Sequence, residues 1–167
     1  MFKAGVLVIS DKGSRGERVD ESGPAAQEVL TKIHVTVTKY EIVPDEKKII
    51  AAKLRAWAEK EKLDLIITSG GTGLSPRDVT PEATRLVIDK EIPGITEVMR
   101  LESLKKTPFG MLSRAIAGSC GKCLIVNLPG SPKAVRECLG AVLQVIPHAL
   151  DILAGKTFEG PHDKVIV

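Results

Sequence analysis

Hydrophobic residues follow two alternating patterns along the chain, one typical of buried strands and the other of amphipathic helices. The strand pattern consists of short apolar runs, or of alternating apolar and polar positions rich in β-branched side chains. Segments of this kind, bounded by turn residues, favour β-strands. The predicted strands cover residues 3–9, 35–43, 63–68 and 122–128.

Between the strands, apolar residues recur three or four positions apart, as Ile50, Leu54 and Trp57 do. This spacing places them on one face of a helix, so it predicts amphipathic helices between the strands. Asp45 and Thr80 stand where helix N-caps are expected. The predicted helices cover residues 21–33, 46–62, 81–90, 95–105, 109–117 and 134–153, the last with a kink at Pro147.

Strands separated by helices imply βαβ units with right-handed crossovers. We therefore predict an α/β fold, a three-layer α/β/α sandwich with a mostly parallel sheet. The 167 residues fit a single domain over residues 1–167, because no repeat, low-complexity linker or shift in composition divides them. The polar segment 155–167 is expected to be a loosely held tail.

The composition argues against several classes of partner. The 24 Lys and Arg residues are interspersed among 21 Asp and Glu, so the net charge of +3 comes without the basic cluster that nucleic-acid binding requires. Aromatic residues make up 3% of the chain, too few for base-stacking platforms. No segment approaches the roughly 20 apolar residues of a membrane span or the roughly 7–15 of a signal peptide. We expect a cytoplasmic protein that binds neither nucleic acid nor membrane.

The three cysteines do not form a recognisable metal or disulfide framework. Cys120 and Cys123 have CxxC spacing, but no second pair and no nearby histidine completes a zinc site, so we predict ordinary reduced cysteines. Cys138 lies on an apolar helical face and is expected in the core. The histidines are scattered singly and form no cluster: His34, His148 and His162.

The most polar turn directly follows the most apolar strand. It reads Thr68-Ser-Gly-Gly-Thr-Gly-Leu-Ser-Pro-Arg-Asp-Val-Thr-Pro-Glu-Ala-Thr84. In a parallel sheet this turn lies at the carboxyl edge, where ligands bind, and its glycines let backbone N–H groups approach a phosphate. The loop is about ten residues long, against the roughly 2–6 usual for a βα connection. Because Asp78 would repel a phosphate unless a cation lay between them, the loop predicts Mg²⁺ and a phosphorylated substrate.

Two further turns carry polar residues at the same edge. Asp45 follows the second strand, and Asn127-Leu-Pro-Gly-Ser-Pro-Lys133 follows the fourth and forms a second candidate anion site. Each has a structural alternative, Asp45 as an N-cap alone and the Pro-Gly-Ser-Pro segment as a turn with Ser131 capping a helix. Asp78 would alternatively be solvated or paired with Arg77. Two carboxylates at one sheet edge, beside a phosphate loop, favour magnesium binding.

Common nucleotide motifs are absent. A Walker motif requires a lysine after its last glycine, and the glycine loop continues with Leu-Ser-Pro. A G-x-G-x-x-G dinucleotide site requires glycine where Pro76 stands. The order of residues indicates no Ser/His/Asp grouping for nucleophilic catalysis.

Taken together, the motifs resemble the molybdopterin-binding family of molybdenum-cofactor biosynthesis, in particular its adenylyltransferases and the corresponding domain of gephyrin. The resemblance rests on segment 68–84, Val43-Pro-Asp45, Leu112-Ser-Arg114 and segment 127–133, and it extends over residues 3–153. It implies an Mg²⁺-dependent enzyme that transfers AMP from ATP to the terminal phosphate of molybdopterin and releases pyrophosphate. A phosphate oxygen is already ionised at neutral pH, which agrees with the missing histidine cluster.

The resemblance also assigns roles to matching positions. Asp45 and Asp78 match the acidic residues of catalysis and metal binding. Thr80 and Lys133 join the predicted site through their place in the two polar turns. The other positions expected to bind substrate or phosphate are Gly70, Gly71, Thr72, Gly73, Ser113, Asn127, Pro129, Gly130 and Ser131, with Asp20 and Gly23 as a further motif near the pocket.

Two alternatives remain open at this point. One is a noncatalytic pterin-binding or scaffolding paralogue, against which stand both aspartates and all the loop glycines. The other is the molybdate-insertion enzyme, whose similar loop normally accompanies additional domains for which 167 residues leave no room. The resemblance further implies a homotrimer, with a hexamer as the alternative, and the molybdate-insertion enzyme as a partner.

Overall fold

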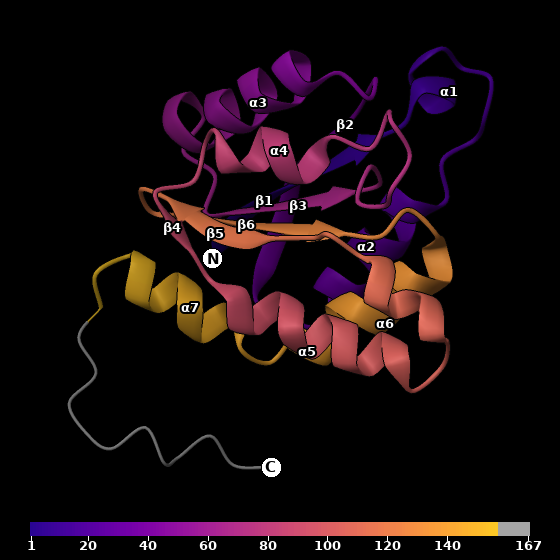
Figure 1. Cartoon of the computed structure of the whole chain (residues 1–167). Helices are drawn as coiled ribbons and strands as arrows, with labels where there is room; N and C mark the ends of the chain where they lie inside the picture. Colours follow the sequence, from indigo (N-terminus) through magenta and orange to yellow (C-terminus); the bar gives the residue numbers. More distant parts are fainter. Residues whose placement is uncertain (157–167) are drawn as a thin grey trace.

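A six-stranded sheet forms the centre of the protein, as a computed structural model describing residues 1–156 shows (Figure 1). Its strand order is β2-β1-β3-β6-β5-β4. The first four strands in this order run parallel, whereas β5 is antiparallel to both β6 and β4. The strands are β1 (Phe2–Ile9), β2 (Val35–Val43), β3 (Leu65–Ser69), β4 (Lys90–Glu91), β5 (Ala117–Cys120) and β6 (Cys123–Leu128).

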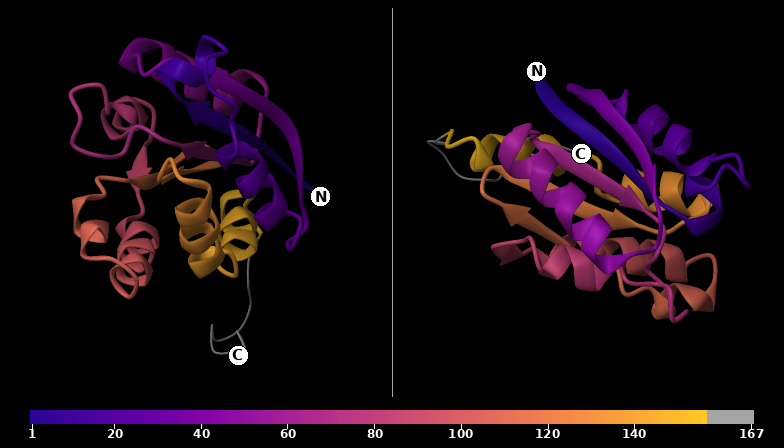
Figure 2. Two further views of the ribbon diagram at one scale, coloured as in Figure 1. Left: turned by 90° about the vertical axis from the view of Figure 1, so that its right-hand side faces the viewer. Right: turned by 90° about the horizontal axis from the view of Figure 1, so that it is seen from above.

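Helices cover both faces of this sheet, which confirms the predicted α/β fold with a mostly parallel sheet (Figures 1 and 2). One face carries α3 (Lys47–Arg55), the π-helix η1 (Ala56–Lys60) and α4 (Thr80–Arg85). The other face carries α2 (Ser22–Leu30), α5 (Pro93–Leu104), α6 (Pro132–Val142) and α7 (Ile146–Leu153). The short α1 (Asp11–Ser14) and the 3-10 helix η2 (Pro108–Leu112) lie in connections.

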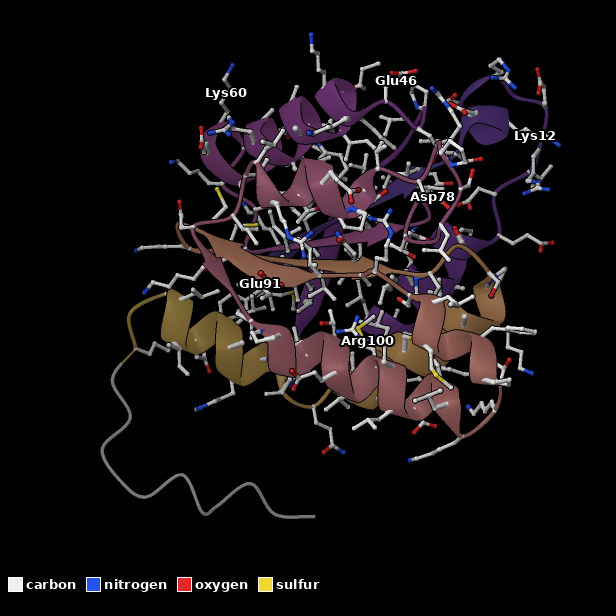
Figure 3. The ribbon with its side chains drawn as sticks, in the orientation of Figure 1. Lys12, Glu46, Lys60, Asp78, Glu91 and Arg100 are labelled. Atoms are coloured by element: carbon white, nitrogen blue, oxygen red, sulfur yellow. The ribbon has the colours of Figure 1, made fainter. Side chains whose placement is uncertain are left out.

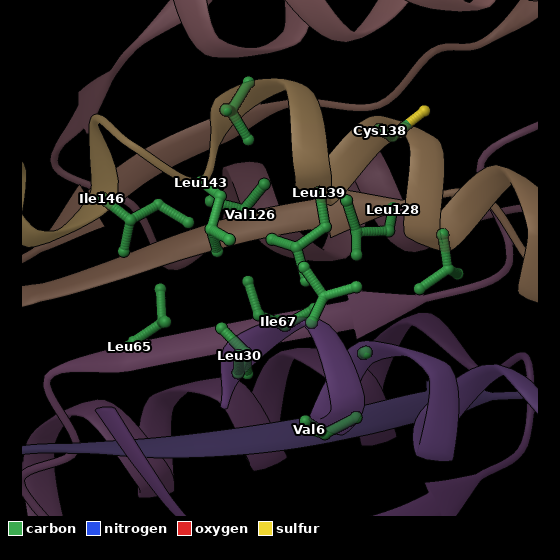
Figure 4. Packing of buried hydrophobic residues seen from close by; sticks show 14 of the residues in the cluster. Val6, Leu30, Leu65, Ile67, Val126, Leu128, Cys138, Leu139, Leu143 and Ile146 are labelled. Atoms are coloured by element: carbon green, nitrogen blue, oxygen red, sulfur yellow. The ribbon is translucent and has the colours of Figure 1, made fainter. Parts of the chain in front are cut away.

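Two apolar cores result from the alternation of side chains along each strand. In β1, Val6 and Val8 enter the core under α2 and α6, while Leu7 and Ile9 enter the core under α3 and α4. Figure 4 shows the first of these cores, where Val6 of β1 and Ile67 of β3 face the helices. Because central strands are buried on both faces, they are almost continuously apolar, which made them recognisable.

The segment 109–117 differs from the helix predicted there. The structure has only η2 at its start, and β5 follows as an edge-side strand that pairs with β6. Ala117-Gly-Ser-Cys120 contains no β-branched residue, so the strand carries little local signal. Gly118 explains part of this composition, because a side chain there would collide with Lys90 and Ile88.

Three predicted helices also have different boundaries. The helix expected over 81–90 ends at Arg85 and leads into β4, and the one expected over 134–153 is two helices, α6 and α7. The helix expected over 46–62 changes to π-helical geometry after Arg55. Most of the predicted tail lies outside the described residues.

The predicted N-caps Asp45 and Thr80 are wrong, whereas Ser131 caps α6 by accepting from the Ala134 N–H. Helix α3 begins after Glu46 without a side-chain cap, because the Asp45 carboxylate is bonded elsewhere. Thr80 is the first residue of α4, and its hydroxyl donates backwards to the Gly70 carbonyl.

The carboxyl ends of β1 and β3 form a topological switch point. After β1 the chain crosses to β2 on one side of it, whereas after β3 the chain crosses to β4 at the opposite edge and returns through β5 to β6. The connections therefore diverge and leave a crevice between the two strand ends. The left view of Figure 2 looks onto this edge of the sheet.

Candidate functional site

A cavity of about 710 Å³ lies at this switch point. It is lined by the ends of β1 and β3, the loop before α2, and the turn before α6. Cavities of this size at such a crevice are typical ligand sites of α/β proteins. The cavity brings together seven of the predicted site residues: Asp20, Asp45, Gly70, Gly71, Asp78, Gly130 and Ser131.

Gly70 and Gly71 turn the chain out of β3 with φ angles of +100° and +68°. A side chain on Gly70 would collide with the Ile9 carbonyl of the neighbouring strand, and one on Gly71 with the Thr80 hydroxyl. Both positions therefore require glycine for conformation and for space. Gly130 packs against this turn, but a Cβ there would lie 3.5 Å from the Gly70 Cα, which is ordinary van der Waals contact.

The glycine turn presents free backbone donors. Within the described residues, the N–H groups of Gly71, Thr72 and Gly73 donate to no acceptor, while the Gly70 N–H donates to Leu128 at 3.1 Å. Successive free N–H groups form an anion-binding concavity. The N-terminus of α6 adds further donors at the same cavity, which Ser131 and Pro132 line.

Asp45 and Asp78 both line the cavity, and each uses one carboxylate oxygen in a hydrogen bond. Asp45 accepts from the Asp11 N–H through Oδ2 at 2.8 Å, and Asp78 accepts from the Ser75 N–H through Oδ2 at 2.9 Å. Their Oδ1 atoms accept no hydrogen bond from the part of the chain that is described. Burial raises the pKa of Asp45, and the nearby charges of Asp11 and Asp78 raise it further against the lowering effect of the Asp11 N–H. A cation would favour the ionised pair.

Arg77 does not pair with Asp78, contrary to one of the alternatives above. Its guanidinium donates two hydrogen bonds to Asp11, each at 3.0 Å, and one to Glu46 at 2.9 Å. The bonds from Arg77 hold the pKa of Asp11 below its usual range, together with the Asp45 N–H. Figure 3 shows Glu46 and Asp78 at the same end of the molecule.

Arg114 holds the other side of the glycine loop. It donates to the carbonyls of Gly73 at 2.7 Å and Asp78 at 2.8 Å, and it forms an ion pair with Glu82. Its own N–H donates to the Thr72 carbonyl at 2.9 Å. These bonds orient the loop carbonyls towards Arg114, which leaves the loop N–H groups available on the other side.

A second, more apolar cavity of about 270 Å³ lies beyond the glycine loop, between α5, η2 and α6. It is lined in part by Met99, Phe109 and Leu112. The predicted site residues that line it are Thr72, Gly73, Ser113 and Pro129. The predicted residues thus divide between two cavities that share the glycine loop as their wall.

Four predicted site residues line neither cavity. Asn127 is fully buried and donates to the hydroxyls of Thr68 and Thr84, each at 3.0 Å. Thr80 is buried and closes the glycine loop. The other two are Gly23, where a side chain would collide with Tyr40 and Asp20, and Lys133, which is exposed on the first turn of α6.

The cysteines are buried and free, as predicted. Burial raises the pKa of each thiol, so none is activated. Among residues 1–156, no group of three or more His, Cys, Asp or Glu side chains is placed to hold a metal ion on its own.

Comparison with known proteins identifies the family. The profile described as "Probable molybdopterin binding domain" matches residues 5–148. The chain belongs to this family.

Relatives of this molybdopterin-binding domain carry consistent names. A molybdopterin adenylyltransferase of Helicobacter pylori is 47% identical over 153 residues, covering 90% of this chain and 87% of its own. Gephyrin of Dictyostelium discoideum is 43% identical over 163 residues, and these cover 91% of this chain but 22% of gephyrin. The crystal structure of the molybdopterin biosynthesis enzyme MoaB from Thermus thermophilus is 56% identical, with a TM-score of 0.89 over 95% of this chain and 100% of that one. The resemblance inferred from the motifs is confirmed.

The sequence interpretation missed three polar residues of the molybdopterin-binding domain. Asp11 follows β1 at the sheet edge, so the argument applied to Asp45 would have found it. Arg18 lines the cavity from the loop before α2, where no strand or glycine marks its position. Arg114 belongs to the Leu-Ser-Arg motif, but its contact with the glycine loop depends on how η2 returns to the sheet.

Proposed function

We propose that this chain is a molybdopterin adenylyltransferase, which transfers AMP from ATP to the terminal phosphate of molybdopterin. The observation that supports it most directly is the pair of carboxylates, Asp45 and Asp78, on one cavity with Gly71, the first residue of the glycine turn with a free N–H group. The H. pylori relative of that name, 47% identical over most of both chains, supports the choice of substrates.

The proposed reaction exchanges one phosphorus–oxygen bond for another. An oxygen of the molybdopterin phosphate bonds to the α-phosphorus of ATP, and the bond from that phosphorus to the β-phosphate oxygen breaks. Pyrophosphate leaves with the electron pair. Because a phosphate monoester is largely ionised at pH 7, the attacking oxygen requires no protein base. The protein instead has to bring several negative charges together and orient them.

The chain's own groups fit these tasks. The N–H groups of Gly71, Thr72 and Gly73 bind phosphate oxygens, and the N-terminus of α6 adds a favourable dipole. Arg18 is the only cationic side chain among the described residues that line the larger cavity. It therefore attracts the triphosphate to a cavity whose other charged lining residues are carboxylates. Asp20 accepts from Ser22 and Gly23 and so holds the start of α2 at the cavity wall.

Mg²⁺ fits the site on the basis of its donor set. Magnesium in phosphoryl-transfer enzymes is held by one or two carboxylates and completed by waters and substrate phosphates. Asp45 and Asp78 each keep one oxygen that accepts no hydrogen bond from residues 1–156, which matches that requirement. When bound there, the ion would neutralise the charge that develops on the phosphates and the leaving pyrophosphate.

The alternative is a noncatalytic molybdopterin-binding or scaffolding domain. Such a domain has no use for two free carboxylate oxygens beside a phosphate loop, because they repel the phosphates that it would bind. Their presence favours the enzyme.

A test compares the purified protein with its Asp78→Asn variant. With molybdopterin, ATP and Mg²⁺, mass spectrometry should detect adenylylated molybdopterin from the unaltered protein. Asp78→Asn should reduce its formation by about 100-fold or more, because stabilisation worth several kcal/mol depends on the metal. Asp151→Asn, at a half-buried ion-pair partner of Lys156 on α7, is the matched control and should keep full activity. Pterin binding without product from the unaltered protein would establish the noncatalytic alternative instead.

Assembly, partner and location are also proposals. We propose a homotrimer, with a hexamer as the alternative, and the molybdate-insertion enzyme as the partner that consumes the product. Exposed apolar side chains on α5 and η2, including Leu101, Phe109 and Met111, support self-association. A cytoplasmic location rests on the composition. Separately, no helix within residues 1–156 is long and apolar enough to cross a membrane.

A further inference from the structure

Arg77 connects three loops at the carboxyl edge of the sheet. It precedes Asp78 in the glycine loop, and its guanidinium reaches Asp11 after β1 and Glu46 before α3. The planar guanidinium uses Nε and Nη2 on the two Asp11 oxygens, and Nη2 also donates to Glu46. Such bidentate geometry fixes orientation as well as distance.

Asp11 in turn holds Asp45 by a reciprocal pair of hydrogen bonds. The Asp11 N–H donates to the Asp45 carboxylate at 2.8 Å, and the Asp45 N–H donates to the Asp11 carboxylate at 3.0 Å. Glu46, the other partner of Arg77, is the next residue in the chain. Arg77 therefore binds two residues that adjoin Asp45: its hydrogen-bond partner Asp11 and its sequence neighbour Glu46. In the sequence, Arg77 directly precedes Asp78.

We propose that Arg77 is a positioning residue, which sets the separation of Asp45 and Asp78 by bridging Asp11 and Glu46. Arg77 and Glu46 do not line the cavity, so Arg77 acts through its neighbours and not on a ligand. The inference rests on the proposed function, because the carboxylate separation matters only if both groups act on one reaction.

An ordinary surface ion pair does not account for this arrangement. Exposed pairs contribute little to stability, and Arg77 has a side chain that is 53% exposed. Here, however, one cation lies among four carboxylates, those of Asp11, Asp45, Glu46 and Asp78. Without it, repulsion between Asp11 and Asp45 would open the reciprocal bonds that hold Asp45. A misplacement of about 1 Å can cost about 100-fold in rate.

The experiment uses Arg77→Gln, which removes both the positive charge and the bidentate guanidinium. It also uses Arg77→Lys, which keeps only the charge. Arg77→Gln should lower kcat by about 10-fold to 100-fold and change the KM for ATP by less than about threefold. Arg77→Lys should recover only part of the loss, since one ammonium cannot reproduce the bonds to Asp11 and Glu46. Arg136→Gln, which breaks a comparably exposed two-bond pair with Glu28, is the matched control and should keep wild-type kcat.

The Mg²⁺ concentration for half-maximal activity separates positioning from charge. Removing a cation near the metal site would by itself strengthen Mg²⁺ binding, whereas spreading the two carboxylates apart would weaken it. The proposal therefore expects Arg77→Gln to require about threefold or more Mg²⁺ above the wild-type level. A lower requirement, or full activity of Arg77→Lys, would overturn it.

Two further measurements test the bridge made by Arg77: amide hydrogen exchange, which does not depend on catalysis, and a double variant. Amide hydrogen exchange should be faster at Asp11 and Asp45 in Arg77→Gln, while exchange in β3 and β6 stays unchanged. Asp11→Asn should lower kcat, and combining it with Arg77→Gln should add little, because both changes break one bridge. The proposal would be contradicted if the kcat of the double variant fell by the product of the two single losses. Unaltered amide exchange at Asp45 in Arg77→Gln would also contradict it. If the wild-type protein forms no product, the proposed function fails, but the exchange result still decides whether Arg77 holds Asp45.

Discussion

Tyr40 reports on the part of the site that contains Asp20. It is the single tyrosine of the chain. Partial burial of the ring, followed by its hydrogen bond to Asp20 at 2.8 Å, raises the pKa of Tyr40 to about 12. A pKa raised in the folded state means that the neutral phenol is preferred there. The raised pKa of Tyr40 stabilises the folded state fully below pH about 10, the pKa of an unfolded tyrosine. This contribution is lost as the pH rises through about 12.

Absorbance at 295 nm during a pH titration measures this pKa directly. The native protein should ionise near pH 12, and Asp20→Asn should lower the midpoint, though not to the unfolded value because burial remains. Asp64→Asn, at a half-buried carboxylate that accepts from the Lys3 N–H, serves as the control. A native midpoint near 10 would show that Tyr40 does not contact Asp20 in solution.

At the same scale, residue type and position in a turn were enough to predict Asp45 and Asp78. Both follow apolar strands in long or polar turns, and the structure places both on one cavity. The family resemblance placed Asn127 in the site, but its side chain turns into the core towards Thr68 and Thr84. Whether a polar residue at a strand end faces a cavity or the interior depends on packing across the sheet, which local sequence does not record.

The glycine loop between β3 and α4 is the element on which the site depends most. Gly71→Ala should lower the free energy of unfolding by more than the about 1–2 kcal/mol of left-handed strain. The additional loss comes from the collision with the Thr80 hydroxyl and from crowding of Asp45 Oδ1 at 3.3 Å. Adenylyl transfer should be lost with it.

Gly16→Ala provides the matched control for this prediction. Gly16 has a similar φ of +73°, but no atom of residues 1–156 lies within 4 Å of an added Cβ. It should therefore show the conformational strain alone and retain activity. The loss in the free energy of unfolding of each variant, Gly71→Ala and Gly16→Ala, follows from its urea unfolding midpoint if the m-values are equal. Equal destabilisation of the two variants would show that the loop adjusts to a side chain at position 71.

Elements with strong periodicity were predictable, and short ones were not. Strands β1, β3 and β6 are buried on both faces and so form apolar runs that no surface segment imitates. Strand β5 is held by pairing with β6 and by the close approach of Lys90 and Ile88 to Gly118. Helix α1 spans four residues, too few for a period, and is capped by Ser10, which accepts from the Gly13 N–H. None of these contacts leaves a periodic pattern of apolar residues in the sequence.

At the scale of the whole molecule, the sheet order explains why three distant segments share one site. β1 lies between β2 and β3, so Asp11, Asp45 and Gly70 leave the sheet at neighbouring strand ends. A mostly parallel sheet was predictable from alternating strands and helices, and with it a common edge. The division of the predicted site residues between two cavities was not predictable from the sequence, because it depends on how α5 and η2 pack beside the glycine loop.

Assembly is the remaining property at this scale. Leu101 on α5 is 62% exposed, and with Phe109 and Met111 it forms an apolar surface that contact with other subunits would bury. We expect sedimentation equilibrium of the wild-type protein to give three times the chain mass of 17.9 kDa. Leu101→Glu should shift the mass towards that of the monomer, because a buried charge without a partner opposes association. Leu86→Glu, 55% exposed on the opposite side of the sheet, should remain trimeric. Dissociation by Leu86→Glu and not by Leu101→Glu would place the interface on the α3 and α4 face instead.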